Sequence, residues 1–221
     1  MFKIIVWYIQ NIWEYVYQML PGMLVTGVVW GCIRPWQRSR LTARGLVSTP
    51  EREGALLLFA LFCTGLGMLT LFPHGLWRVL LTQPHPWDAI RRLYPSWEEI
   101  QSHLTLIPDN WYPFQEIRRI LWGGEWIWFV LWGNIGMFMP VGFFVALLWR
   151  KARWYRSVAV GFLASLLIEF VQLFIGRVSD IDDVILNTTG ALLGYGVYWL
   201  FYKLFPRAAV RFQVSEQGED T

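Results

Sequence analysis

Charged residues are scarce in this sequence. Only 16% of its 221 residues are charged, whereas 55% are hydrophobic and 18% are aromatic. A soluble domain typically carries about 25% charged residues. The shortage excludes an ordinary soluble protein and predicts an all-α fold, a polytopic integral membrane helical bundle. A β-barrel is excluded because its strands alternate over about ten residues, and the apolar runs here are continuous and longer.

Residues for redox, metal and nucleophilic chemistry are also few. The two cysteines, Cys32 and Cys63, fall near or within apolar runs, which favours small membrane-buried side chains over a disulfide or redox pair. The sequence contains no P-loop, nucleophile elbow or H-E-x-x-H motif, so it names no cofactor. The arginine clusters flank apolar runs, as topology signals do, and indicate no nucleic-acid partner.

The apolar runs predict about five transmembrane helices. The first run is irregular, and we expect a span kinked near Pro21 and preceded by an aromatic interfacial turn or helix. Its polar interruptions, such as Glu14, and the lack of a small-residue cleavage site argue against a signal peptide. The predicted spans are residues 15–33, 54–72, 126–149, 157–175 and 187–205.

The positions of the basic residues predict the topology. The short basic connections 34–53 and 150–156 are expected on the cytoplasmic side of the cell (inner) membrane. With five spans, the N-terminus then lies outside and the C-terminus in the cytoplasm. We expect residues 1–205 to form one domain and residues 206–221 to form a flexible cytoplasmic tail.

Residues 73–125 form a long, Trp-rich connection that this topology places outside. Ser96 and Glu99 fit a capping box, which predicts a short helix. Pro113 is suited to the first position of another helix, on which Phe114, Ile117 and Leu121 would share one face. Such a helix would lie in the interface, although an ordered surface loop explains the same residues.

Polar residues recur at helical spacing in the last two spans. Residues three or four apart share a face of a helix, so they form one stripe in each span. The stripes are Ser165, Glu169, Gln172 and Gly176 in the fourth span, and Asp183, Asn187, Gly190 and Gly194 in the fifth. Gly190 and Gly194 form a G-x-x-x-G pair that permits close backbone approach. Because a tight connection joins these spans, we expect the stripes to face each other.

These polar groups predict a pocket open to the outer face. Glu169 lies about 10 Å below the outer end of its span, and Asn134 of the third span lies at a similar depth. Arg177 is the expected partner of the Glu169 carboxylate. Intramembrane ionisable groups are usually functional, which favours a binding or catalytic site over a network that only locks helices together. The candidate catalytic residues are Glu169, Asp183 and Asp180, and the candidate binding residues are Arg177, Asn134, Gln172, Asn187 and Ser165.

A metal site is not predicted at these carboxylates. The acidic connection, with Asp180, Asp182 and Asp183 near Glu169, lacks the glycine and the later glutamate of an EF-hand loop.

The same residues resemble motifs of the VanZ-like family. Taken in order, with spacings kept, they cover about residues 105–200. The family's name-giving member is associated with resistance to the glycopeptide teicoplanin. The resemblance implies a membrane protein that acts at the outer face on cell-envelope precursors or on antibiotic access. The matching elements are Pro113-Phe114, residues 134–142 (NIGMFMPVG), Ser165 to Glu169 with Gln172, Asp180-x-x-Asp183-x-x-x-Asn187-Thr188, and Gly190-x-x-x-Gly194.

Three functions stay open at this point. In the first, the pocket binds an envelope lipid or glycan head group, with Arg177 on an anionic group such as phosphate. In the second, the protein is a membrane-embedded hydrolase or transferase that uses Glu169 and Asp183 in acid–base chemistry. In the third, it is a non-catalytic structural or partner protein that docks through the Trp-rich loop. The expected partners are membrane lipids and lipid-linked envelope precursors.

Overall fold

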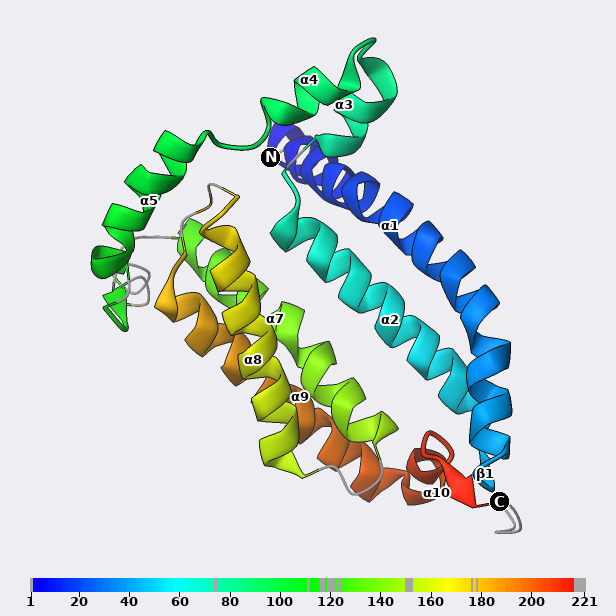
Figure 1. Ribbon diagram of the computed structural model, residues 1–221. Coiled ribbons are helices and arrows are strands. Elements are labelled where there is room, and N and C mark those ends of the chain that lie inside the picture. Colours follow the sequence, from blue (N-terminus) through cyan, green and yellow to red (C-terminus); the bar gives the residue numbers. More distant parts are fainter. Residues whose placement is uncertain are drawn as a thin grey trace.

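The computed structural model describes residues 2–73, 75–110, 112–115, 118, 122, 125–149, 153–175, 177 and 179–216. The chain is mostly helical (Figure 1). In order, the elements are α1 (Phe2–Thr42), β1 (Leu46–Val47), α2 (Pro50–Leu71), α3 (Leu76–Thr82), α4 (Pro86–Arg91), α5 (Trp97–Asn110), α7 (Glu125–Leu148), α8 (Trp154–Gln172), α9 (Ile181–Leu204), α10 (Pro206–Val210) and β2 (Ser215–Glu216).

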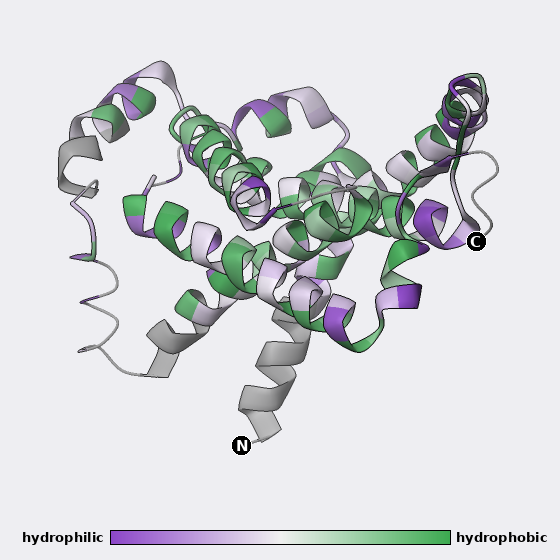
Figure 2. Ribbon diagram, turned by 90° about the horizontal axis from the view of Figure 1, so that it is seen from below, coloured by the Kyte–Doolittle hydropathy of each residue, from purple (hydrophilic) through white to green (hydrophobic). Residues whose placement is uncertain are grey.

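Within these described ranges, five helices are long and apolar enough to cross a membrane. The predicted helical membrane bundle is therefore confirmed as a fold class. Hydrophobic residues predominate on the long helices in Figure 2. The spanning segments are Trp13–Thr42, Pro50–Leu71, Leu131–Leu148, Trp154–Gln172 and Ile181–Leu204.

Helix α7 is central to the bundle, because it packs against α9, α8 and α2. Its buried side chains include Phe138 and Ala146, which are almost fully enclosed. Helix α1 packs against α2 at the side of this group (Figure 1).

Glycines bring the backbones of α7 and α9 together. A Cβ atom at Gly194 would overlap the carbonyl oxygen of Met139, and one at Gly190 would overlap that of Ile135. From the other side, Gly142 of α7 meets the backbone of Ala191. The G-x-x-x-G pair therefore mediates close approach to α7, whereas the sequence had led us to expect close packing on α8. Close approach needs small residues at the crossing point, and α7 supplies its own at Gly142.

The first helix differs from the prediction. Instead of a span over residues 15–33 followed by a basic loop, α1 is a helix of 41 residues that continues through Pro21 and Pro35. At 1.5 Å per residue it is about 60 Å long, roughly twice the thickness of a bilayer core. Arg34 and Arg40 therefore lie on its last turns. Arg34 forms an ion pair with Glu53 of α2, and Arg40 lies 3.7 Å from the ring centroid of Trp36.

The fifth span begins earlier than predicted. Helix α9 starts at Ile181 and not at Asn187, because Asp180 is its N-cap and accepts a hydrogen bond from the backbone N–H of Asp182 at 2.9 Å. Asp182 and Asp183 then occupy the first turn, where negative charge is favourable near the helix N-terminus. The acidic residues are therefore part of the helix and not of the connection.

The predicted capping box is present at the start of α5. The backbone N–H of Ser96 donates to Glu99 Oε2 at 2.6 Å, and the N–H of Glu99 donates to Ser96 Oγ at 3.3 Å. Ile117 and Leu121 lie outside the described residues, so the interfacial helix after Pro113 stays a prediction.

The segment predicted to be a flexible tail contains helix α10 and strand β2 as far as Glu216, and its flexibility stays a prediction. Helix α10 follows α9 directly, and β2 pairs antiparallel with β1. The hydroxyl of Thr49 also donates to the carbonyl of Arg211. These contacts fix residues 206–216 to the α1–α2 connection. That residues 1–205 form a single domain stays a prediction.

Candidate functional site

Polar side chains from α7, α8 and the first turns of α9 meet at one end of the bundle. Between α7 and α9, Asn134 Nδ2 donates to Asp183 Oδ1 at 2.5 Å. Between α8 and α9, Asn187 Nδ2 donates to Ser165 Oγ at 2.9 Å, and both residues are buried. The stripes of α8 and α9 therefore meet at Ser165 and Asn187 as predicted, whereas Asp183 of the α9 stripe turns to α7.

Glu169 is the most deeply buried carboxyl group among the predicted site residues, with 2% of its surface exposed. Its Oε2 accepts a hydrogen bond from the backbone N–H of Asp180 at 3.0 Å. Since Asp180 is the N-cap of α9, the Glu169 carboxyl lies at the positive end of the α9 dipole. The start of α9 and the end of α8 are thus tied together by this side chain.

Asp182 belongs to the same region, although it is not among the predicted site residues. It is fully buried, and its Oδ1 accepts from the backbone N–H of Phe114 at 2.5 Å. Phe114 has a φ of +68°, a left-handed conformation that is uncommon for a bulky residue. Asp182 therefore holds the Pro113-Phe114 element beside α9. Its position in the first turn after an Asp N-cap is the sequence signal that could have identified it.

Arg177 does not pair with Glu169, which corrects the sequence prediction. Its Nη1 donates to the carbonyl oxygens of Leu69 and Thr70, at 3.0 and 2.9 Å, at the C-terminal end of α2. Gln172 Nε2 donates to the Thr70 carbonyl as well, at 3.2 Å. The last carbonyl groups of a helix lack backbone partners, and in a membrane they must be satisfied within the protein. A cation there is also favoured by the helix dipole.

The other side of the α2 end is capped from α1. Gln18 Nε2 donates to the carbonyl oxygens of Met68 and Phe72, at 2.8 and 3.2 Å. Gln172 and Arg177 are thus placed with Gln18 around the end of α2. We call the remaining predicted residues, with Asp182, the α9 cluster: Asn134, Ser165, Glu169, Asp180, Asp182, Asp183 and Asn187. Gly176 lies outside the described residues.

The α9 cluster is rich in hydrogen-bond acceptors. Asn187 Oδ1 is buried and has no hydrogen-bond partner in the described part of the chain. Carboxyl oxygens of Glu169 and Asp183 lie on the same two facing helices. Acceptors of this kind bind hydroxyl or ammonium groups, which donate. Among the described residues, no group of three or more His, Cys, Asp or Glu side chains is placed to hold a metal ion.

Comparison with known proteins gave one result. The sequence model of the VanZ/LLP1 family matches residues 59–202, which is well over half of the chain and includes the whole α9 cluster. No curated protein and no solved structure gave a match.

Proposed function

Because the chain belongs to the VanZ/LLP1 family, we propose that its α9 cluster binds the glycan head group of a lipid-linked cell-envelope precursor. The observation that carries this proposal is the unpartnered acceptor Asn187 Oδ1 beside the carboxyl groups of Glu169 and Asp183. Sugar hydroxyl groups donate hydrogen bonds to such acceptors. A link to glycopeptide resistance would follow if the bound precursor is one that the antibiotic also recognises.

Conservative changes in the cluster test this proposal. Glu169→Gln and Asp183→Asn keep side-chain shape and retain an oxygen that can accept from Asp180 N–H and from Asn134, respectively. Each replaces a carboxyl oxygen with an amide nitrogen, so the cluster loses an acceptor, and leaving a hydrogen-bonding group without its partner costs about 1–3 kcal/mol. We therefore expect each variant to bind lipid-linked precursor about tenfold more weakly or worse. Binding is measured by native mass spectrometry of the purified protein in detergent.

Asp88→Asn is the matched control, because Asp88 is an exposed acid on α4. It should bind precursor as the unchanged protein does. Full binding by both Glu169→Gln and Asp183→Asn would rule out the α9 cluster as the site.

A membrane-embedded hydrolase or transferase is the second candidate. What favours it is that each carboxyl group is oriented by a fixed donor, Asp180 N–H for Glu169 and Asn134 for Asp183. Acid–base catalysis needs carboxyl groups held in a defined orientation. Incubation of the purified protein with lipid-linked precursors should then yield a new product by mass spectrometry. If the precursor is bound but recovered unchanged, the binding function stands and the enzyme does not.

The proposed orientation places the α9 cluster outside the cell membrane, with the N-terminus outside and the C-terminus in the cytoplasm. It is supported by arginines such as Arg34 and Arg38 near the end of α1 and Arg153 and Arg156 at the start of α8, since basic residues favour the cytoplasmic side. We expect a fluorescent protein fused after Thr221 to fluoresce. Alkaline phosphatase should be active when inserted after Gln83, between α3 and α4, and inactive after Thr221. The reverse pattern would invert the topology.

A further inference from the structure

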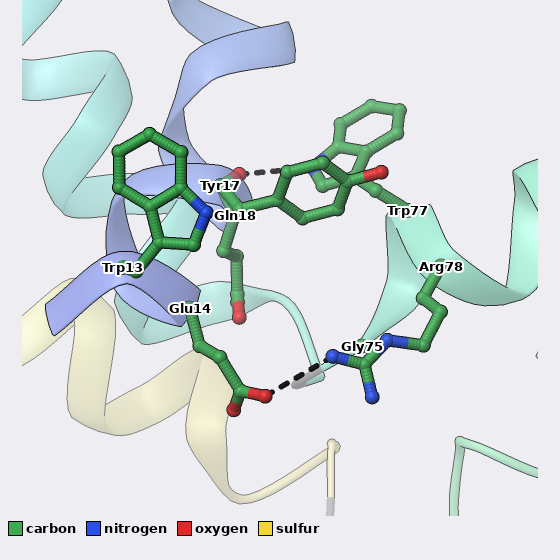
Figure 3. Close-up of a pocket in the computed structure, with 7 residues that line it drawn as sticks. All are labelled: Trp13, Glu14, Tyr17, Gln18, Gly75, Trp77 and Arg78. Carbon is green, nitrogen blue, oxygen red and sulfur yellow. Dashed lines mark hydrogen bonds and ion pairs between the residues drawn. The ribbon is translucent and has the colours of Figure 1, made fainter. Parts of the chain in front are cut away.

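A second polar site lies between α1 and α3, away from the α9 cluster. It is a cavity of about 400 Å³, within the ~300–1,000 Å³ range of small-molecule sites. Figure 3 shows its lining residues. Those on α1 precede residue 59, where the family match begins, whereas Gly75, Trp77 and Arg78 lie within it. Its lining residues are Trp13, Glu14, Tyr17, Gln18, Gly75, Trp77 and Arg78.

The cavity lies at the depth of lipid head groups. Helix α3 follows closely after Leu71, the last residue of the second spanning segment, and Gln18 of α1 donates to the carbonyl oxygen of Phe72 just beyond that end. The ends of spanning segments lie at the membrane–water interface, where tryptophan and tyrosine are enriched. A ligand that resides permanently in this layer is a phospholipid head group.

The cavity combines an aromatic wall, in which Trp77 is held in place, with a movable charged rim. Trp77 Nε1 donates to the carbonyl of Gln18 at 2.9 Å, which fixes α3 against α1. In Figure 3 the ring of Tyr17 points toward Trp77, while Glu14 and Arg78 face each other on another side. Glu14 and Arg78 form an ion pair at 3.0 Å, with 66% and 68% of their side chains exposed. Exposed pairs of this kind are weak, so both side chains can turn to a ligand at little cost.

We propose that this cavity binds the head group of a zwitterionic phospholipid, with its phosphate on Arg78 and its ammonium group on Glu14 against the rings of Trp13, Tyr17 and Trp77. Guanidinium groups bind phosphate through several N–H donors. Ammonium groups are attracted both to a carboxylate and to the faces of aromatic rings. One acid and one base side by side match a ligand that carries both charges. An anionic head group without the ammonium would leave Glu14 facing negative charge.

The test uses the purified full chain and short-chain lipids. Dihexanoyl-phosphatidylethanolamine should bind at least tenfold more tightly than dihexanoyl-phosphatidylglycerol, which has the phosphate but no ammonium group. Glu14→Gln and Arg78→Gln should each weaken binding of the ethanolamine lipid at least tenfold. Glu51→Gln and Arg211→Gln are matched controls and should leave it unchanged, because these residues form another exposed pair, at 3.9 Å, at the opposite end of α2.

Two further arms separate the alternatives. Glycerophosphoethanolamine carries the head group without acyl chains, and binding as tight as that of the lipid assigns the affinity to the head group alone. If glycerophosphoethanolamine binds more weakly than the lipid, and Glu14→Gln still abolishes this binding, the acyl chains contribute part of the affinity. The proposed head-group site then stands. Equal binding of the two lipids, unchanged binding in both cavity variants, or preference for an N-acetylglucosamine oligosaccharide would each overturn the proposal.

Discussion

Gly194→Ala is expected to destabilise the folded protein by roughly 3 kcal/mol or more, at or above the upper end of the usual cost of overpacking. The added Cβ would overlap the carbonyl oxygen of Met139 and lie 2.8 Å from its carbonyl carbon. These are backbone atoms of α7, so no side chain can rotate away to relieve the overlap. The helices must separate, and the contact between α7 and α9 that positions Asn134 on Asp183 is then lost. Thermal unfolding in detergent, with the folded fraction monitored by size-exclusion chromatography, measures the loss of stability.

Gly196→Ala provides the control on the same helix, because a Cβ atom at Gly196 would meet nothing within 4 Å. Alanine also has the better helix propensity, so this variant should be as stable as the original protein or slightly more stable. Equal melting temperatures for the two variants would show that α7 and α9 do not meet at Gly194.

Arg177→Ala is expected to lower stability by about 2 kcal/mol. The change removes the donor to the Leu69 carbonyl and one of the two donors to the Thr70 carbonyl. Leaving a buried acceptor unsatisfied costs ~1–3 kcal/mol. Arg177→Lys keeps a positive charge and a donor, so it should recover part of the loss. Thermal unfolding of the three proteins measures both effects.

The control here is Arg211→Ala, since that side chain is exposed and surface changes are usually within about 0.5 kcal/mol. Glu169→Gln supplies a second comparison, because the glutamine oxygen can still accept from Asp180. Glu169→Gln should weaken precursor binding with little change in stability. Arg177→Ala should mainly lower the stability of the folded protein. A variant of Arg177 that is fully stable but loses precursor binding would return Arg177 to the binding site.

The sequence predicts the interior spans well because their signal is long and uniform. Helices α2, α7 and α8 begin and end within a few residues of the predicted spans. The predicted helix boundaries are wrong where the apolar run and the capping residue indicate different starting points. Helix α9 begins at Ile181, directly after its Asp180 cap and six residues before the apolar run that defined the predicted span. Helix α1 runs through two prolines because a helix can lose single hydrogen bonds and continue. Helices α3 and α4 are too short to show a periodic pattern.

The pairing of the stripes was predictable, and the role of Arg177 was not. Spacings of three and four residues place Ser165 and Asn187 on facing sides of α8 and α9, where the structure has them hydrogen-bonded. For Arg177 the sequence indicates a partner among the nearby acids, Glu169 above all. Its partners are instead uncharged carbonyl groups of α2, more than 100 residues earlier. No pattern along the chain records which helix ends will meet, so this contact follows only from the tertiary structure.

The capped end of α2 has a consequence for biosynthesis. Chains are made from the N-terminus, at about 5–20 residues per second, so α1 and α2 emerge as a hairpin well before residue 177 exists. Gln18 can donate to the carbonyl groups of Met68 and Phe72 as soon as these are made, because it precedes them in the chain. The carbonyl groups of Leu69 and Thr70 have their donors, Gln172 and Arg177, at and just after the end of α8. Until these residues are made, water or lipid head groups must donate to them. The first hairpin is therefore completed only when the fourth helix has been inserted beside it.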